Sequence, residues 1–113
     1  VYLRDTPFME VDVPVCVSGA VGNWEHCASS RKTALAEDPV ATRVADAYPD
    51  VRLVDLTPYL CPGRAKDPCP AVRDGVMLYR DRNHLTDAAA RGLQPVLAAA
   101  LDPVLDEGRA GLH

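Results

Sequence analysis

The sequence predicts an α/β fold, because short apolar strands alternate along it with helical segments. Three runs are typical of strands: Val1–Arg4, Val51–Asp55 and Gly75–Tyr79. Between and after these runs, apolar residues recur every three or four positions, which is the period of a helix that lies on a sheet. At 113 residues, of which 48% are hydrophobic, the chain has enough apolar side chains for a single core.

The charge and hydropathy of the chain argue against nucleic-acid binding and against a membrane span. The formal net charge is −4 and basic residues are scattered among acidic ones, so we expect no nucleic-acid partner. No apolar run approaches the roughly 20 residues that cross a bilayer. The chain starts as if in mid-strand, without a signal peptide, so we expect any export signal or membrane anchor to lie upstream.

Turn and cap residues delimit the first elements. The first strand ends at Asp5-Thr6-Pro7, because a residue before proline avoids helical geometry. Asp5 and the preceding Arg4 either border a pocket or only form the turn, and the turn is favoured. Asp12, followed by Pro14, predicts the start of a brief helix.

A second helix and a second strand follow. Glu37-Asp38-Pro39 predicts the start of a helix that runs to about Tyr48. The apolar face of this helix is predicted at Val40, Val44 and Ala47. The strand after it ends at Asp55, a residue for which capping of the next turn is favoured over a catalytic role.

The last third of the chain contains a loop, a strand and a long helical region. Cys61–Arg73 is rich in proline and is predicted to be neither strand nor helix. Thr86 predicts a helix start, and Pro95 predicts a bend or break in that helix. The predicted apolar stripe consists of Leu93, Val96, Leu97, Ala100 and Leu101. Residues 106–113 are predicted to be a polar tail that frays.

The four cysteines lie close together in two pairs. Cys16 and Cys27 bracket a glycine-rich loop, and Cys61 and Cys69 bracket a proline-rich one, so we favour one disulfide within each pair and an oxidising compartment. Free thiols, or a zinc site that includes His26, are the alternatives; we expect no metal, because structural zinc sites favour cysteines two to four residues apart.

Trp24 lies in the loop between Cys16 and Cys27. Its indole either covers the disulfide or lines a sugar-binding surface. Burial is favoured, because an indole has a large apolar area to hide.

Asp81 and His84 are the candidate catalytic residues. They lie on the predicted loop between the last strand and the helix that begins at Thr86, which is where an open α/β sheet places its site. A histidine whose far nitrogen is held by a carboxylate forms the base and orienter of a hydrolytic triad. A nucleophile is the member that is missing.

Around these two residues the chain resembles the SGNH hydrolase superfamily, whose last block is Asp-x-x-His. More narrowly, it resembles the extracytoplasmic SGNH domain fused to membrane O-acyltransferases of the acyltransferase-3 type, which acylate cell-surface polysaccharides. The matching segments are Arg4-Asp5-Thr6-Pro7, Asp12-Val13-Pro14-x-Cys16, Val54-Asp55-Leu56, Cys69-Pro70 and Tyr79-Arg80-Asp81-x-x-His84-Leu85-Thr86. They extend from Val1 to about Leu101.

The resemblance implies a three-layer, flavodoxin-like SGNH hydrolase fold of which only the C-terminal half, residues 1–105, is present. The family's nucleophilic serine, in a Gly-Asp-Ser block, and its oxyanion glycine and asparagine precede the matching region. Gly22-Asn23 follows the wrong strand for the oxyanion role, and an ordinary turn is favoured there. This chain alone is therefore expected to be inert and to need the missing N-terminal half.

The resemblance also implies a function: an O-acyltransferase that transfers an acyl group, acetyl by expectation, to a hydroxyl of a cell-envelope polysaccharide, without a cofactor. An upstream multi-pass membrane domain would supply the acyl donor and tether the domain on the extracytoplasmic side. The alternatives are a secreted carbohydrate esterase, and a disulfide-stapled domain that binds a glycan or a protein without catalysis.

Overall fold

The computed structural model describes residues 1–36 and 39–110. In chain order the helices are α1 (Val13–Gly19), the 3-10 helix η1 (Trp24–Cys27), α2 (Arg31–Ala34), α3 (Pro39–Ala47), α4 (Thr57–Leu60), α5 (Asp87–Gly92) and α6 (Gln94–Ala110). The strands are β1 (Tyr2–Leu3), β2 (Leu53–Val54), β3 (Val72–Arg73) and β4 (Val76–Met77). Helices and strands are thus mixed along the chain, which is compatible with the predicted α/β fold.

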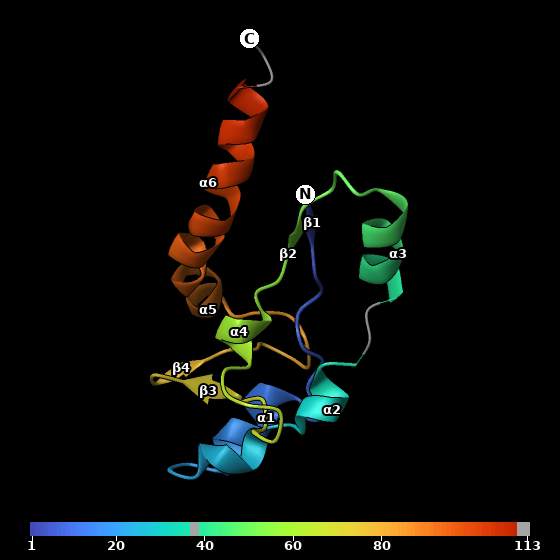
Figure 1. Cartoon of the computed structure of the whole chain (residues 1–113). Helices are drawn as coiled ribbons and strands as arrows, with labels where there is room; N and C mark the ends of the chain where they lie inside the picture. The colour runs from blue at the N-terminus through green and yellow to red at the C-terminus, as the bar shows by residue number, and fades with distance from the viewer. Residues whose placement is uncertain (37–38, 111–113) are drawn as a thin grey trace.

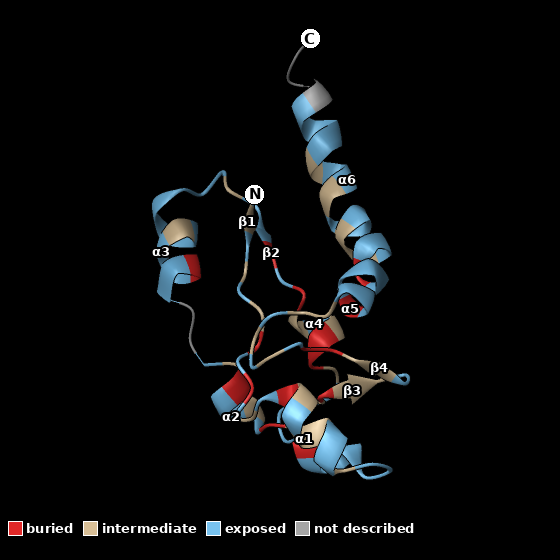
Figure 2. Cartoon of the chain, turned by 180° about the vertical axis from the view of Figure 1, so that it is seen from behind, coloured by how far each residue is buried: buried red, intermediate tan, exposed pale blue. Residues whose placement is uncertain are grey.

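Strands β1 and β2 form a parallel pair in which Tyr2 lies opposite Leu53. Parallel strands need a crossover connection, and α3 lies on the segment that makes it. The strand pair stands between α6 and α3 when seen from the front and from behind (Figures 1 and 2).

The last predicted strand pairs with a segment that was not predicted to be a strand. Val76–Met77 pairs antiparallel with Val72–Arg73 and not with the β1–β2 pair. The two strands are joined by a two-residue turn in which Asp74 has a φ of 53° and Gly75 a φ of 76°, as a hairpin of type I′ requires. The prediction that residues 61–73 contain no strand is therefore wrong at its end.

Helix α3 has the predicted length but a different buried face. Ala41 is buried, whereas Val40 is 51% exposed. Val44 is half-buried and Ala47 is exposed, so the described residues leave most of the predicted stripe uncovered. The predicted helix start at Glu37 and Asp38 lies outside the described residues.

Helices α5 and α6 meet near Pro95, where the sequence predicted a break. Helix α5 ends at Gly92, and α6 begins at Gln94 with Pro95 in its first turn. Helix α6 then continues to Ala110, so the first residues of the segment predicted to be a fraying tail are helical. In the described part of the chain, no helix is both long and apolar enough to cross a membrane.

Two disulfides hold the lower part of the molecule in Figure 1. They join Cys16 to Cys27 and Cys61 to Cys69, the two pairs that the sequence favoured. All four cysteines are bonded, so the free-thiol and zinc alternatives are wrong. Ser29 and Cys69 exchange two main-chain hydrogen bonds of 2.9 and 2.8 Å, which link the two stapled segments.

Buried side chains form two clusters, drawn in red in Figure 2. The first lies in the disulfide-bonded part, and the second lies between β2, α4 and the start of α6. The first cluster consists of Met9, Val13, Cys27, Ala34, Cys61, Cys69, Ala71, Leu78, Tyr79 and Ala89, and the second of Val54, Leu56, Leu60 and Leu93. Leu85 packs against both, so the residue after His84 lies where the clusters meet.

Candidate active site

The loop that carries Asp81 and His84 is closed by main-chain hydrogen bonds at its base. Arg80 donates its N–H to the carbonyl of His84 at 2.8 Å, and Thr86 donates its N–H to the carbonyl of Leu78 at 2.9 Å. Tyr79 and Leu85 form an isolated antiparallel bridge between these bonds. The strand before the loop and the helix after it therefore hold residues 80–84 as one tight turn.

The side chains of Asp81 and His84 contact each other within this loop. The His84 Nδ1 atom lies 2.7 Å from Asp81 Oδ2. The other carboxylate oxygen, Oδ1, accepts the main-chain N–H groups of Asn83 and His84 at 2.8 and 2.7 Å. Both side chains are open to solvent, with exposed fractions of 41% for Asp81 and 60% for His84.

Hydrogen bonds keep the carboxylate ionised. The main-chain N–H of His84, followed by that of Asn83 and then by the His84 side chain, lowers the pKa of Asp81 to about 2. An ionised carboxylate only accepts hydrogen bonds, so the proton of neutral His84 resides on Nδ1. The lone pair is then on Nε2, to which no described residue hydrogen-bonds. This nitrogen can therefore take a proton from a reactant.

The segment after β1 anchors the loop from the other side. Thr6 donates its hydroxyl to the carbonyl of Asn83 at 2.7 Å. Met9 and Val13 donate their main-chain N–H groups to the carbonyls of Arg82 and Asp81 at 2.6 and 3.3 Å. Sequence reasoning missed these three supports, because no local pattern links positions so far apart in the chain.

Thr86 caps α5 as predicted and also ties the helix to β4. Its hydroxyl accepts the N–H of Ala89 at 3.1 Å and donates to the carbonyl of Met77 at 2.6 Å. The start of α5 is thereby fixed next to the end of the strand.

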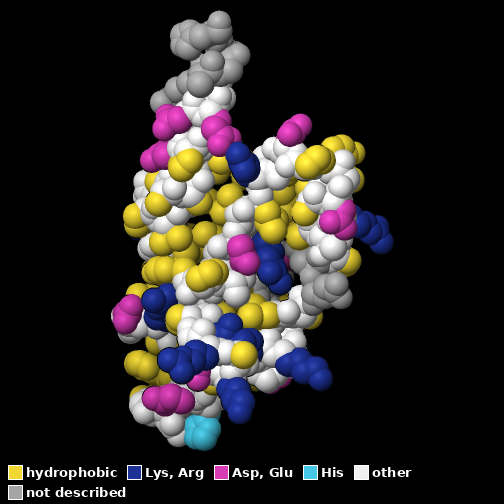
Figure 3. Space-filling view, viewed as in Figure 1, with side chains coloured by type: hydrophobic (Ala, Val, Ile, Leu, Met, Phe, Trp, Pro, Cys, Tyr) yellow, Lys and Arg dark blue, Asp and Glu magenta, His cyan; other side chains and the backbone are white. Residues whose placement is uncertain are grey.

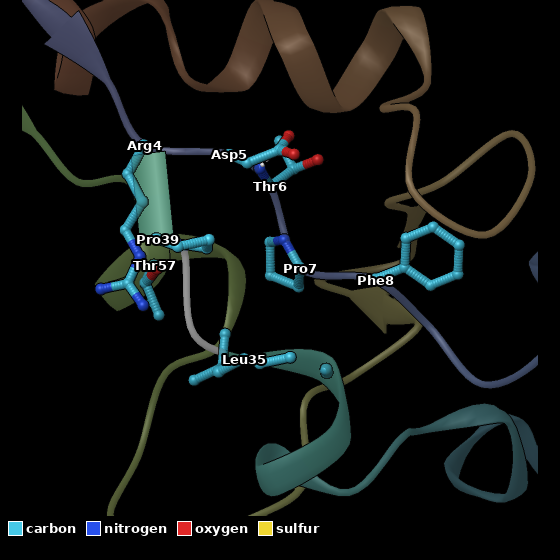
Figure 4. Close-up of a pocket in the computed structure, with 10 residues that line it drawn as sticks. Arg4, Asp5, Thr6, Pro7, Phe8, Leu35, Pro39 and Thr57 are labelled. Carbon is cyan, nitrogen blue, oxygen red and sulfur yellow. Dashed lines mark hydrogen bonds between the residues drawn. The ribbon is translucent and has the colours of Figure 1, made fainter. Parts of the chain in front are cut away.

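A cavity of about 190 Å³ opens beside the carboxyl end of β1 (Figure 4). In Figure 4, Arg4 and Thr57 lie next to each other on the left of the view, and Phe8 lies on the right. Arg4 and Asp5 both line this cavity, which agrees with the alternative that these two residues border a pocket. Asp81 and His84 do not line it. Thr6 joins the two places, since it lines the cavity and donates to the Asp81–His84 loop.

Asp55 takes the capping role that the sequence favoured. It accepts the N–H of Thr57 at 2.9 Å and lies 3.2 Å from the Arg4 guanidinium. Partial burial raises the pKa of Asp55, but hydrogen bonds from Thr57 and the charge of Arg4 outweigh burial and leave it below its usual range.

Gly22-Asn23 lies in the turn between α1 and η1, not at the Asp81–His84 loop. Gly22 has a φ of 78°, and Asn23 donates its N–H to the carbonyl of Ala20. These are the features of an ordinary turn, as the sequence favoured. In the described residues, His, Cys, Asp and Glu side chains form no group of three or more that could hold a metal ion.

Comparison with known proteins identifies one similarity. A family model described as the SGNH domain (fused to AT3 domains) matches residues 1–99 of the chain. No curated protein and no solved structure matches it.

Proposed function

Because the chain belongs to the family of SGNH domains fused to AT3 domains, we propose that Asp81 and His84 are the acid–base pair of an O-acyltransferase. The nucleophilic serine would lie on a preceding half of the same domain. The observation that carries this proposal is the 2.7 Å contact between His84 Nδ1 and Asp81 Oδ2, which leaves Nε2 open to a reactant.

The proposed reaction has two acyl-transfer steps. In the first, His84 Nε2 takes the proton of the serine hydroxyl while the serine oxygen attacks the acyl carbonyl, and the imidazolium then returns this proton to the departing donor group. In the second, His84 takes the proton of a glycan hydroxyl, whose oxygen attacks the acyl-serine. The ester of the glycan forms, and the proton passes back to the serine. Asp81 would stabilise the imidazolium in both steps through its bond to Nδ1.

Three properties of the chain support the idea that it is the C-terminal half of a larger, three-layer flavodoxin-like domain. The radius of gyration is 16.1 Å, whereas a compact domain of this length has a radius of about 13 Å. The parallel sheet has only two strands among the described residues. Leu3 and Leu53 on these strands are 50% and 46% exposed, and an N-terminal half that supplies further strands would cover them.

The cellular setting that we propose follows from the family and from the disulfides. Fusion to AT3 domains implies the context of a membrane protein, and two disulfides suggest the extracytoplasmic side. In this setting an upstream membrane domain would deliver the acyl group, proposed to be acetyl, and a cell-envelope polysaccharide would accept it.

The exposure of His84 favours an esterase as the second candidate. With 60% of its side chain exposed, water can reach the imidazole and replace the glycan hydroxyl in the second step. The two activities share every residue named above and differ only in the acceptor.

The test uses the natural protein that contains this chain together with its Gly-Asp-Ser block. We expect it to release acetate from 4-nitrophenyl acetate, and His84→Ala to lower the rate by at least about a thousandfold, as loss of a triad member does. The matched control is His26→Ala, which removes an exposed histidine of η1 and should leave the rate unchanged. A His84→Ala rate close to that of the unmodified protein would refute the assignment.

A further inference from the structure

A second cavity lies between η1 and the β3–β4 hairpin, in the disulfide-bonded part of the molecule. Its volume is about 240 Å³, and Trp24, Glu25, Pro70 and Asp74 are among the residues that line it. This volume is below the roughly 300–1,000 Å³ of pockets for drug-sized ligands. The cavity therefore suits a single ring rather than a large cofactor.

Trp24 is exposed here, although the sequence favoured burial. Its exposed fraction is 41%, whereas Cys27 in the same short helix is fully buried. Because Cys27 is bonded to Cys16 and the next residues pair with Cys69, the backbone under the indole is tightly held. The protein thus presents a large aromatic face to solvent on a rigid support, at little cost in conformational entropy on binding.

Two carboxylates, those of Glu25 and Asp74, line the same cavity as the indole and lack strong partners. Asp74 is 91% exposed, and its nearest cation is the Arg73 guanidinium at 4.0 Å. Within the described residues, no hydrogen bond or ion pair engages the carboxylate of Glu25. Asp74 is held in place by the type I′ turn, because its φ of 53° belongs to that hairpin.

This combination matches the chemistry of a sugar ring. The C–H face of a pyranose packs on an aromatic ring, and the hydroxyls at its edge donate hydrogen bonds to carboxylates. Two carboxylates repel an anionic ligand. A single aromatic residue also falls short of the several aromatic walls that enclose a quaternary ammonium group.

We propose that Trp24, Glu25 and Asp74 form a subsite for one neutral sugar ring of a glycan. The inference deepens the proposed function and rests on it in one respect, namely that the glycan bound here is the acceptor. The hairpin that carries Asp74 continues directly into the Asp81–His84 loop, so one segment of chain connects the subsite with the acid–base pair.

Trp24 is the only tryptophan of these 113 residues, so a fluorescence change that disappears in Trp24→Phe reports on this subsite. The longer natural protein and its Trp24→Phe variant are titrated with cellohexaose, maltohexaose and chitohexaose, and with choline as a cationic probe, and the difference between their emissions is followed. We expect at least one hexasaccharide to shift the emission in a saturable way and choline to have no effect. An emission that no hexasaccharide changes, or that only choline changes, overturns the proposal.

Calorimetric titration of the longer natural protein tests the individual residues. We expect Trp24→Ala to raise the Kd for that hexasaccharide at least about tenfold, and Glu25→Gln and Asp74→Asn to raise it severalfold. Tyr48→Ala is the matched control, because Tyr48 is also exposed, at 63%, and lies after α3. An unchanged Kd in Trp24→Ala overturns the proposal.

The variant His84→Ala separates this inference from the proposed function. We expect it to bind the hexasaccharide as tightly as the unmodified protein while ester cleavage is lost. Binding that depends on Trp24 in a protein without any esterase or transferase activity would refute the catalytic proposal and keep the sugar subsite.

Discussion

Thr6 and Asn83 are 77 positions apart in the sequence, yet the Thr6 hydroxyl donates a 2.7 Å hydrogen bond to the carbonyl of Asn83. This bond ties the end of β1 to the loop that holds Asp81 and His84. The geometry of Asp81 and His84 is therefore set by two levels of structure: a local turn that brings the carboxylate and the imidazole together, and a distant strand end that holds this turn in place.

The pKa of Asp81 should depend more on main-chain donors than on the imidazole. In a ¹³C NMR titration of the carboxyl group we expect a midpoint near 2, compared with 3.8 for an ordinary aspartate. In His84→Ala the main-chain N–H groups of residues 83 and 84 remain, so the midpoint should stay well below 3.8. A return to 3.8 in this variant would show that the imidazole alone is responsible.

The same shift has a consequence for acid stability. Because the folded-state pKa of Asp81 is lowered, its stabilising contribution is fully present above pH 3.8 and is lost as the pH falls through about 2. We therefore expect Asp81→Asn to weaken the pH dependence of stability in this window. Urea unfolding of both proteins between pH 2 and pH 5 measures the free energy of unfolding at each pH. Equal slopes of this free energy against pH in the two proteins would contradict the expectation.

Replacement of Thr86 by valine should destabilise the fold. The valine keeps the volume but loses both hydroxyl bonds, one to Ala89 and one to Met77, so we expect a loss of about 1–2 kcal/mol in the free energy of unfolding. Thr86→Ser is the matched control because it retains the hydroxyl. If the valine and serine variants unfold at the same urea concentration, the two hydrogen bonds of the Thr86 hydroxyl do not stabilise the fold.

The two disulfides should contribute unequally to stability. Loop closure over separations of 11 and 8 residues is worth about 2–3 kcal/mol for each bond in the chain-entropy model. Cys61 and Cys69 are both buried, whereas Cys16 is only partly so. We therefore expect the double variant Cys61→Ala/Cys69→Ala to lose more stability than Cys16→Ala/Cys27→Ala. Thermal unfolding compares them, and the reverse order would contradict the packing argument.

Removal of the Tyr79 hydroxyl should not harm the fold. Tyr79 is fully buried, and its hydroxyl finds no hydrogen-bond partner among the described residues. A buried hydroxyl without a partner costs roughly 1–3 kcal/mol, so Tyr79→Phe should leave the free energy of unfolding unchanged or raise it. Exposed Tyr48→Phe serves as the control. A clear loss of stability in Tyr79→Phe would reveal a partner for the hydroxyl.

Features of the site that depend on neighbours in the sequence could be predicted. Asp81 and His84 are three residues apart, so one turn of loop brings them together whatever the rest of the chain does. The same holds for Thr86, whose partner in α5 is three residues away, and for each disulfide, which closes a short loop.

The β3–β4 hairpin was also predictable from local sequence but was missed. Asp74-Gly75 is a strong signal for a type I′ turn, and apolar Val72 and Val76 flank it. The many prolines of the preceding segment favoured a loop instead. Proline excludes strand pairing only where its missing N–H is needed, and β3 begins after the last of these prolines.

Tertiary contacts explain what local sequence could not predict. Glu107 lies in the segment predicted to fray, but it pairs with Arg52 at 2.9 Å, and this pair links the end of α6 to the start of β2. Hydrophobic side chains gather along α6 in Figure 3. Val96 and Leu97 of this helix pack on the cluster around Leu60. No periodicity within α6 could reveal that β2 lies alongside it.

The bonds that position the Asp81–His84 loop use only the main chain of residues 82 and 83. The carbonyls of Arg82 and Asn83 accept from Met9 and Thr6, and the N–H of Asn83 donates to Asp81, while neither side chain takes part. Evolution can therefore exchange these two side chains, which precede His84 in the loop, without altering the geometry of its imidazole. They form a ready pair of positions for a randomised library in which substrate preference is selected while the chemistry stays intact.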